Sequence, residues 1–413
     1  AKHDVKILGL IGSGHFLSHF YMLCLPPLFV VFKKEFGVSY TELGLLLSVR
    51  EVITGSLQLP MGILVDRIGA RSVLTIGLLM MSVGIGLMAF ADSYWMLMAF
   101  IALMGLGSST FHPADFTILN STIASSRMGR AFSLHSFSGQ IGTASAPAVI
   151  IFLTTMINWR AALLVVSGIG IAVAFTLIAQ WSSLDSDAIP GKRSPAKDQA
   201  RDEAKNTDAE GTEAGKPAEM SVLAIILSKP LMIFLLFYAM TSLTSSGIQA
   251  FSVVAMIDLY KTPLGMASGA LTGFLLASAA GVLMGGVIAD RTKRHDVIAA
   301  LAFIATAVII FIIGAVSLPY VLLVFAMTLA GLLQGVIRPS RDMMVRQVIP
   351  KSATGRAFGF VNSGSAIGGV FAPLTFGVVL DQGHPEWVFY LLAIFMALSV
   401  VTAIVPKGSL KRD

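Results

Sequence analysis

Apolar runs of about twenty residues recur along this chain, and each is long enough to cross the ~30 Å hydrocarbon core of a bilayer as a helix. Inside a bilayer the backbone must satisfy its own hydrogen bonds, so such runs fold as helices. Only 13% of the residues are charged, against about 25% in soluble domains. We therefore predict an all-α membrane protein with twelve spans, at residues 5–31, 41–65, 72–91, 94–120, 129–156, 160–181, 229–257, 266–289, 297–317, 319–347, 355–380 and 386–406.

Basic residues orient these spans. Most of the 29 lysines and arginines fall in the termini and in every second loop, whereas the opposite loops hold only Lys33, Lys34, Arg160 and Lys261. Because cytoplasmic loops are enriched in Lys and Arg, we predict a bacterial inner (plasma) membrane protein with both termini and the central loop in the cytoplasm. The net charge of +6 then reflects topology and not nucleic-acid binding.

A polar segment of mixed charge without aromatic residues, 185–219, interrupts the apolar pattern. It predicts a disordered cytoplasmic linker, residues 183–222, between two six-helix bundles at residues 1–182 and 223–413. Its Gly191-Lys192 pair lacks the first glycine and the Ser/Thr of a phosphate-binding loop, and no such loop occurs elsewhere. We therefore expect no cofactor, and an ion or solute gradient as the energy source.

The two halves repeat each other. GRAFSLHSFSGQIGTASAP (129–147) aligns without gaps on GRAFGFVNSGSAIGGVFAP (355–373), an offset of 226. GILVDRIGAR (62–71) matches GVIADRTKRH (286–295) at an offset of 224. Parallel repeats of this kind predict two bundles related by an axis along the membrane normal, with a central cavity between them.

The loop after the second span carries the pattern G-x3-D-R-x-G-x-R, and its degenerate copy keeps Asp290 and Arg291; the first copy consists of Gly62, Asp66, Arg67, Gly69 and Arg71. With twelve spans and a central loop, this pattern resembles the major facilitator superfamily of secondary transporters across nearly the whole chain. The S-S-x-F-H-P run in the fourth span is similar to the fosmidomycin-resistance-type exporters. The resemblance implies a monomeric carrier and not an enzyme. Such a carrier opens its binding site alternately to the two sides of the membrane.

The resemblance also places Asp66 beside the start of the eleventh span, where Gly355 and Arg356 begin a helix. A carboxylate near a helix N-terminus is stabilised by about 0.3–1 kcal/mol. We therefore expect a latch between the halves on the cytoplasmic side. The alternative, a basic loop that only sets topology, explains the two arginines but not the spacing of the aspartate and the glycines.

Polar residues inside the spans are the candidates for a transport site. GLGSSTFHP (105–113) overlays GLLQGVIRP (331–339), so His112 corresponds to Arg338 and Asp115 to Arg341, and the matched prolines are expected to interrupt both helices. A charge costs about 2.5–3.5 kcal/mol at a helix centre, so it must face a cavity or a partner. The substrate-binding candidates are His19, Arg50, His112, Arg338, Arg341, Tyr238, Gln249 and Asn362. The proton-carrying candidates are Glu51 and Asp115, because dehydration favours a protonated carboxylic acid.

Several pairings stay open. Asp115 either meets Arg341 across the halves, as an inner gate of the outward-open state, or pairs with Arg50 in its own half. Arg50 with Glu51 or Asp115 is alternatively a static ion pair, and His15 is alternatively a packed interface residue.

HFLSH (15–19) has the histidine spacing of a zinc protease but lacks its glutamate, and the chain has one cysteine, so we expect no metal site.

These residues favour a proton-coupled secondary transporter. The alternatives are a gradient-driven facilitator or exchanger, which needs no titrating carboxylate, and a membrane sensor or assembly protein that transports nothing. Three arginines in the spans suit a carboxylate, phosphate or phosphonate, so we expect a small organic anion; a lipophilic drug is the alternative. The expected partners are this substrate, protons and membrane lipids, and import and export are equally compatible with the sequence.

Overall fold

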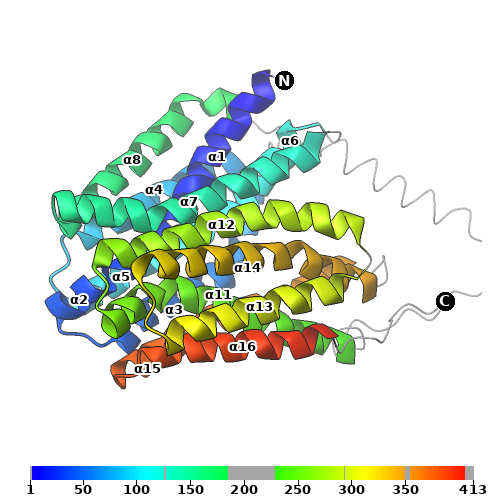
Figure 1. Ribbon diagram of the computed structural model, residues 1–413. Coiled ribbons are helices and arrows are strands. Elements are labelled where there is room, and N and C mark those ends of the chain that lie inside the picture. The colour runs from blue at the N-terminus through cyan, green and yellow to red at the C-terminus, as the bar shows by residue number, and fades with distance from the viewer. Residues whose placement is uncertain (1, 125–126, 185–227, 293, 349–353, 405–413) are drawn as a thin grey trace, which may run out of the picture.

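The computed structural model describes residues 2–124, 127–184, 228–292, 294–348 and 354–404, and these residues form helices and no strand (Figure 1). The first half contains α1 (Lys2–Met22), η1 (Pro26–Leu28), α2 (Phe29–Phe36), α3 (Tyr40–Ile68), α4 (Ala70–Met88), α5 (Tyr94–Ser108), α6 (Phe111–Thr122), α7 (Met128–Met156), α8 (Trp159–Ala179) and η3 (Trp181–Leu184). The second half contains α11 (Lys229–Tyr260), α12 (Leu264–Arg291), α13 (His295–Ala315), α14 (Tyr320–Val348), α15 (Thr354–Asp381) and α16 (Glu386–Ile404). Most of the predicted linker lies outside the described residues.

Ten helical segments among the described residues are long and apolar enough to cross a membrane. The remaining two predicted spans are also helical. α3 has the length but carries Arg50 and Glu51 in its middle, and α16 is apolar but its apolar stretch, Glu386–Thr402, is shorter. The predicted class, an all-α membrane protein, is confirmed.

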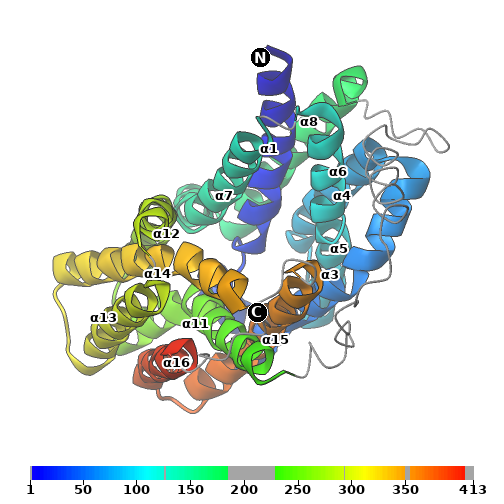
Figure 2. The same cartoon turned by 90° about the vertical axis from the view of Figure 1, so that its right-hand side faces the viewer.

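The packing of the helices repeats between the halves. α1 packs against α7 as α11 packs against α15, α3 against α5 as α12 against α14, and α4 against α8 as α13 against α16. The two bundles lie side by side in both views, and two equivalent pairs join them, α3 with α15 and α7 with α12 (Figures 1 and 2). The sequence repeat is therefore also a structural repeat.

The fourth and tenth spans differ, contrary to the predicted matched breaks. The fourth is divided into α5 and α6, whereas α14 runs unbroken through Pro339. At the break, Ser109 Oγ donates to the carbonyl of Leu106 at 2.6 Å and Thr110 Oγ1 to that of Gly107 at 2.8 Å. The unbroken helix α7 contains the same kind of bond, from Ser138 Oγ to the carbonyl of His135 at 2.7 Å, so these bonds accompany the break and do not by themselves cause it. The tenth span has Gly335 and Val336 at these positions, which offer no such donor.

One end of the molecule joins the halves through hydrogen bonds between α3 and α15. The Asp381 carboxylate accepts from the backbone N–H groups of Tyr40 and Thr41, each at 2.8 Å, and from the Thr41 hydroxyl at 2.6 Å. The Phe29 and Phe251 rings pack nearby across the halves, with centroids 5.4 Å apart. We call this the closed end; it is the end where α3 begins and α15 finishes.

The opposite end contains the loop that was predicted to form a latch. Asp66 is exposed there and forms no ion pair with any residue in the described part of the chain. Gly69 links α3 to α4 with a φ of 87°, a value that suits glycine. The side chains of Asp290 and Arg356 lie outside the described residues, so the latch stays a prediction.

Candidate functional site

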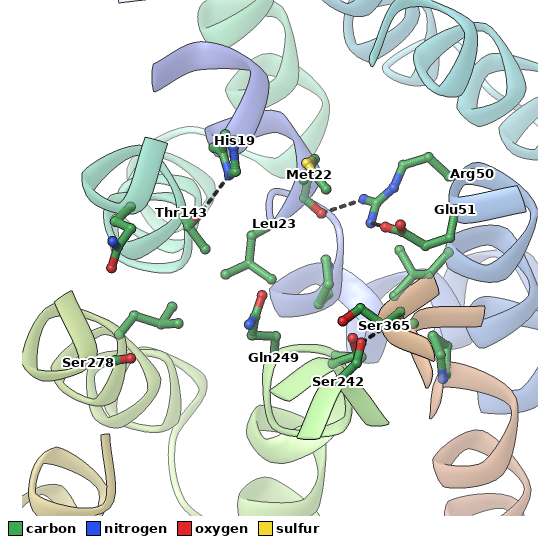
Figure 3. Close-up of a pocket in the computed structure, with 18 of the residues that line it drawn as sticks. His19, Met22, Leu23, Arg50, Glu51, Thr143, Ser242, Gln249, Ser278 and Ser365 are labelled. Carbon is green, nitrogen blue, oxygen red and sulfur yellow. Dashed lines mark hydrogen bonds and ion pairs between the residues drawn. The ribbon is translucent and has the colours of Figure 1, made fainter. Parts of the chain in front are cut away.

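A cavity of about 300 Å³ lies between the two bundles. Its polar lining comes from α1, α3 and α7 of the first half and from α11, α12, α14 and α15 of the second. Figure 3 shows Arg50 and Glu51 on one wall, His19 and Thr143 on another, and Gln249 with Ser242 on the helix below. The polar lining residues are His19, Arg50, Glu51, Gln140, Thr143, Ser242, Ser246, Gln249, Ser278, Arg338 and Ser365.

Arg50 and Glu51 form an ion pair at the cavity wall. The Arg50 guanidinium donates to Glu51 Oε1 at 2.5 Å and to the carbonyl of Met22 at 2.6 Å. Met22 is the last residue of α1, where carbonyl groups lack a partner within the helix. The Arg50 side chain is 7% exposed and that of Glu51 28%, so the carboxylate is the more accessible partner. Of the two predicted pairings of Arg50, the one with Glu51 forms in this conformation.

The opposite bundle brings a second arginine to the cavity. Arg338 lies on α14, across from Arg50, and is half-buried. His19 Nδ1 lies 3.3 Å from the Thr143 hydroxyl, and Gln249 contributes an amide. The cavity therefore contains two guanidinium groups and one carboxylate, with neutral hydrogen-bonding groups around them.

Four predicted binding residues do not line this cavity. His112 is exposed and lines a separate pocket with Gln58 and Phe116. The Arg341 guanidinium lies over the Tyr238 ring, 4.0 Å from its centroid, and Tyr238 is buried. Asn362 is exposed on α15.

Some lining residues were missed by the sequence analysis. Gln140 and Thr143 lie in the repeated segment, where the second copy has Ala366 and Gly369. At both positions a polar residue of the first repeat aligns with a small residue of the second repeat. This difference between the copies could have marked both residues as candidates for the cavity lining. Serines gave no signal, because they are common in membrane helices, where the hydroxyl bonds to the helix's own backbone.

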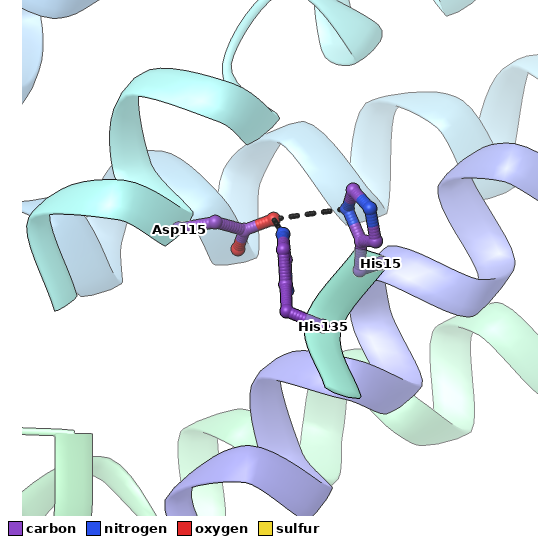
Figure 4. Close-up of side chains that lie close together, drawn as sticks. All are labelled: His15, Asp115 and His135. Atoms are coloured by element: carbon purple, nitrogen blue, oxygen red, sulfur yellow. Dashed lines mark ion pairs between the residues drawn. The ribbon is translucent and has the colours of Figure 1, made fainter. Parts of the chain in front are cut away.

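Asp115 lies apart from the cavity, fully buried among histidines of the first bundle. Its Oδ2 is 3.2 Å from His15 Nδ1 and 3.5 Å from His135 Nε2 (Figure 4). The pairing with Arg50 is therefore wrong for this conformation, because histidines surround the carboxylate and Arg50 binds Glu51. Asp115 also does not meet Arg341 here, and the gate of an outward-open state stays a prediction. His135 was missed.

The loop residues of the G-x3-D-R-x-G-x-R pattern occupy the surface. Arg71 donates to the carbonyl of Trp181 at 3.3 Å and stacks on its ring, which ties α4 to the segment after α8. Arg67 and Arg291 are exposed, and Gly62 is half-buried on α3. These positions fit the predicted place of the loop at the end opposite the closed end.

Known proteins resemble this chain over its whole length. An uncharacterized MFS-type transporter, YfnC of Bacillus subtilis (strain 168), is 23% identical over 412 residues, covering 98% of this chain and 94% of the relative. The fosmidomycin resistance protein of Escherichia coli (strain K12) is 22% identical over 412 residues, covering 99% and 94%. A probable L-galactonate transporter of the same strain is 28% identical over 142 residues, covering 34% of this chain and 31% of the relative.

A solved structure has the same fold. The crystal structure of a bacterial homologue of the human lysosomal transporter Spinster, in an inward-facing and unoccupied conformation, matches with a TM-score of 0.70 at 13% identity, covering 98% of this chain and 95% of that one. The model of the Major Facilitator Superfamily matches residues 11–297 and 235–411. The chain therefore belongs to the major facilitator superfamily, whose members are membrane transporters and not enzymes.

Proposed function

We propose that this transporter carries a small organic anion together with a proton, by alternating access around the cavity between the bundles. One observation carries the proposal: Arg50 and Arg338 reach the same cavity from opposite bundles. A substrate bound to both would contact both moving halves. Occupancy of the cavity would then bias the rocking of one bundle against the other.

The size and charge of the cavity support a small anion. Its volume of about 300 Å³ lies at the lower end of the range for small-molecule sites, which is roughly 300–1,000 Å³. A guanidinium group presents paired N–H donors that match carboxylate, phosphate and phosphonate oxygens. Two guanidinium groups and one carboxylate line the cavity, so its described lining contains more cationic than anionic side chains.

The ion pair supports coupling to protons. Glu51 neutralises Arg50 while it is ionised, and protonation of Glu51 would release the Arg50 N–H donor that it now occupies. Anion binding and proton binding would therefore favour each other, which is the thermodynamic requirement for cotransport. Glu51 lines the cavity and Asp115 does not, so the coupling proposal rests on Glu51.

The names of the relatives fit an anion. The probable L-galactonate transporter is named for a carboxylate, and fosmidomycin is a phosphonate. A second candidate is a lipophilic drug, because a multidrug resistance protein, MdtH of Yersinia enterocolitica, is 31% identical over 114 residues, 28% of this chain. Leu23, Leu47 and Leu275 in the cavity would serve such a substrate.

We place the closed end at the outer surface. The positive-inside pattern puts the termini and the loop of Asp66 on the cytoplasmic side, and the α3–α15 contacts lie at the opposite end. In this orientation the bundles are joined on the outside, and the structure corresponds to an inward-facing conformation.

A thermal-shift screen followed by flux measurements tests the proposal. Carboxylates, phosphonates and lipophilic drugs would be added to the purified protein, and the compounds that raise Tm would be tested in proteoliposomes with and without a proton gradient. We expect stabilisation by an organic anion and its uphill accumulation when a proton gradient is imposed. Stabilisation by lipophilic drugs alone would favour the second candidate, a lipophilic drug as the substrate. A flux that is the same with and without the proton gradient would refute the coupling to protons.

A further inference from the structure

We propose that His15, Asp115 and His135 bind a divalent transition-metal ion of the Zn²⁺ class inside the first bundle. One ligand atom from each residue, namely His15 Nδ1, an Asp115 carboxylate oxygen and His135 Nε2, lies within 4.8 Å of the others. The residues come from α1, α6 and α7, so the three helices meet at this point (Figure 4). This inference is independent of the proposed transport function.

The distances fit a tetrahedral ion. Zn²⁺ binds imidazole nitrogen and carboxylate oxygen at about 2.0–2.2 Å, so neighbouring ligand atoms of a tetrahedron lie roughly 3.3–3.6 Å apart. Asp115 Oδ2 is 3.2 Å from His15 Nδ1 and 3.5 Å from His135 Nε2, close to two edges of such a tetrahedron. The third edge, between the two imidazole nitrogens, is within 4.8 Å, and the stacked rings would have to turn so that both nitrogens point at the ion.

The second observation that points to an ion is that the candidate ligand atoms are buried and form no hydrogen bonds. The exposed fraction is 0% for Asp115 and 3% for each histidine. His15 Nδ1, both Asp115 oxygens and both His135 nitrogens make no hydrogen bond of acceptable geometry. Each buried polar atom without a partner costs about 1–3 kcal/mol. A proton would satisfy one pair of these atoms, whereas a metal ion would satisfy three of them at once.

The chemistry of the ligands selects the class of ion. Two imidazoles and one carboxylate suit Zn²⁺, Co²⁺, Ni²⁺ or Cu²⁺, whereas Mg²⁺ and Ca²⁺ prefer oxygen ligands alone. The His15 and His135 rings stack with centroids 3.7 Å apart. Two protonated rings would repel each other at this distance, so the stack favours neutral imidazoles, the form that binds metal. Two imidazoles on one tetrahedral ion have centroids about 5 Å apart, so the rings would have to separate when the ion binds. Three protein ligands leave a fourth position for water.

His112 offers a route into the buried cluster. It is exposed, lines the pocket with Gln58 and Leu59, and its ring centroid is 5.8 Å from that of His15. An ion in that pocket would meet His112 first and then His15. No metal site was expected from the sequence, because HFLSH lacks the glutamate of a zinc protease and the chain has one cysteine. Asp115 and His135 lie on helices far along the chain from His15, so the spacing of residues within one helix does not reveal them.

Gly139 positions the ligand ring. A Cβ atom at this position on α7 would lie 2.7 Å from His15 Nε2 and 2.8 Å from His19 Cδ2, closer than normal contact. The glycine therefore lets the edge of the His15 ring with Nε2 and Cδ2 approach α7 closely. Gly139→Ala should displace the His15 ring and weaken metal binding although no ligand is removed.

Titration calorimetry with Zn²⁺ tests the site on the full chain, purified without a polyhistidine tag and stripped with EDTA. We expect one ion per chain, and Co²⁺ should show the visible absorption of a tetrahedral complex. Asp115→Asn, which keeps the side-chain shape, and His135→Ala should each weaken binding at least about 100-fold, because even residues that only orient ligands contribute about 10–100-fold.

Matched variants separate this site from other histidines. His295 is buried in the second bundle with an unpartnered Nδ1, and His384 is exposed beside Glu386, so His295→Ala and His384→Ala should bind Zn²⁺ like the wild type. Zn²⁺ should raise the Tm of these controls but not that of Asp115→Asn, and Mg²⁺ should have no effect. Gel filtration checks that each variant is folded. Absence of stoichiometric binding to the wild type, or equal binding by a folded Asp115→Asn variant, would overturn the proposal.

Discussion

Asp381 is the residue whose removal should most directly open the closed end. Its carboxylate accepts the first two N–H groups of α3 and the Thr41 hydroxyl, all across the boundary between the halves. Hydrogen bonds to charged groups contribute about 1.5–3 kcal/mol each, and water would replace part of this because the side chain is 22% exposed. We take about 2 kcal/mol for the three together, so Asp381→Ala should shift the conformational equilibrium about 30-fold toward opening.

The substitution should change conformation more than folding. The start of α3 keeps its own cap, because the Ser39 hydroxyl accepts the N–H of Glu42 at 3.1 Å and the Glu42 carboxylate accepts the N–H of Ser39 at 2.7 Å. Ser39→Ala is therefore the matched control: it removes a cap from the same helix end but no contact between the halves, and should lower Tm by destabilising α3.

Spin-label distances measure the shift. Labels at Lys34 and Gln382, both exposed at the closed end, would report the separation of the halves in a Cys24→Ser background. We expect a longer-distance population to grow in Asp381→Ala and not in Ser39→Ala. An unchanged distance distribution in Asp381→Ala, or the same shift in the control, would refute the assignment of Asp381 to closure.

Three further predictions concern the cavity and the same boundary. Arg338→Lys keeps the charge but loses the paired donors, so anion affinity measured by calorimetry should fall by about 1–3 kcal/mol; equal affinity would make Arg338 structural. Glu51→Gln should abolish proton-driven accumulation in proteoliposomes while counterflow continues, and retained accumulation would remove Glu51 from coupling. Gly377→Ala would place a Cβ 2.7 Å from the carbonyl oxygen of Tyr40, so it should lengthen the same spin-label distance; no change would show that the helices absorb the methyl group.

Apolar run length predicted the helices, because a bilayer leaves the backbone few alternatives. The G-x3-D-R-x-G-x-R pattern, the twelve spans and the central loop predicted the family. The sequence also identified Arg50, Glu51 and Arg338 as candidates, because a charge inside an apolar span is costly unless it faces a cavity or a partner. All three line the cavity between the bundles.

The contacts between side chains were harder to predict. The alignment of the copies paired Asp115 with Arg341 by symmetry, but His135, which turns toward the carboxylate, aligns with Val361 and has no symmetric counterpart. The effect of a proline also depended on its neighbours. Pro113 lies one turn after Ser109 and Thr110, where the helix breaks, whereas Pro339 lies one turn after Gly335, which stays helical and packs closely on the α12 backbone.

The broken fourth span and the unbroken tenth make the two bundles mechanically unequal. α14 is one continuous helix of 29 residues, although Pro339 beside Arg338 lacks the N–H that would close one turn of it. α6 is a separate helix of 12 residues that follows a break after α5, so we expect it to tilt relative to α5 more easily than one half of α14 tilts relative to the other. The molecule is thus symmetric in its packing but not in its stiffness, and elastic deformation during a transport cycle should concentrate in the first bundle.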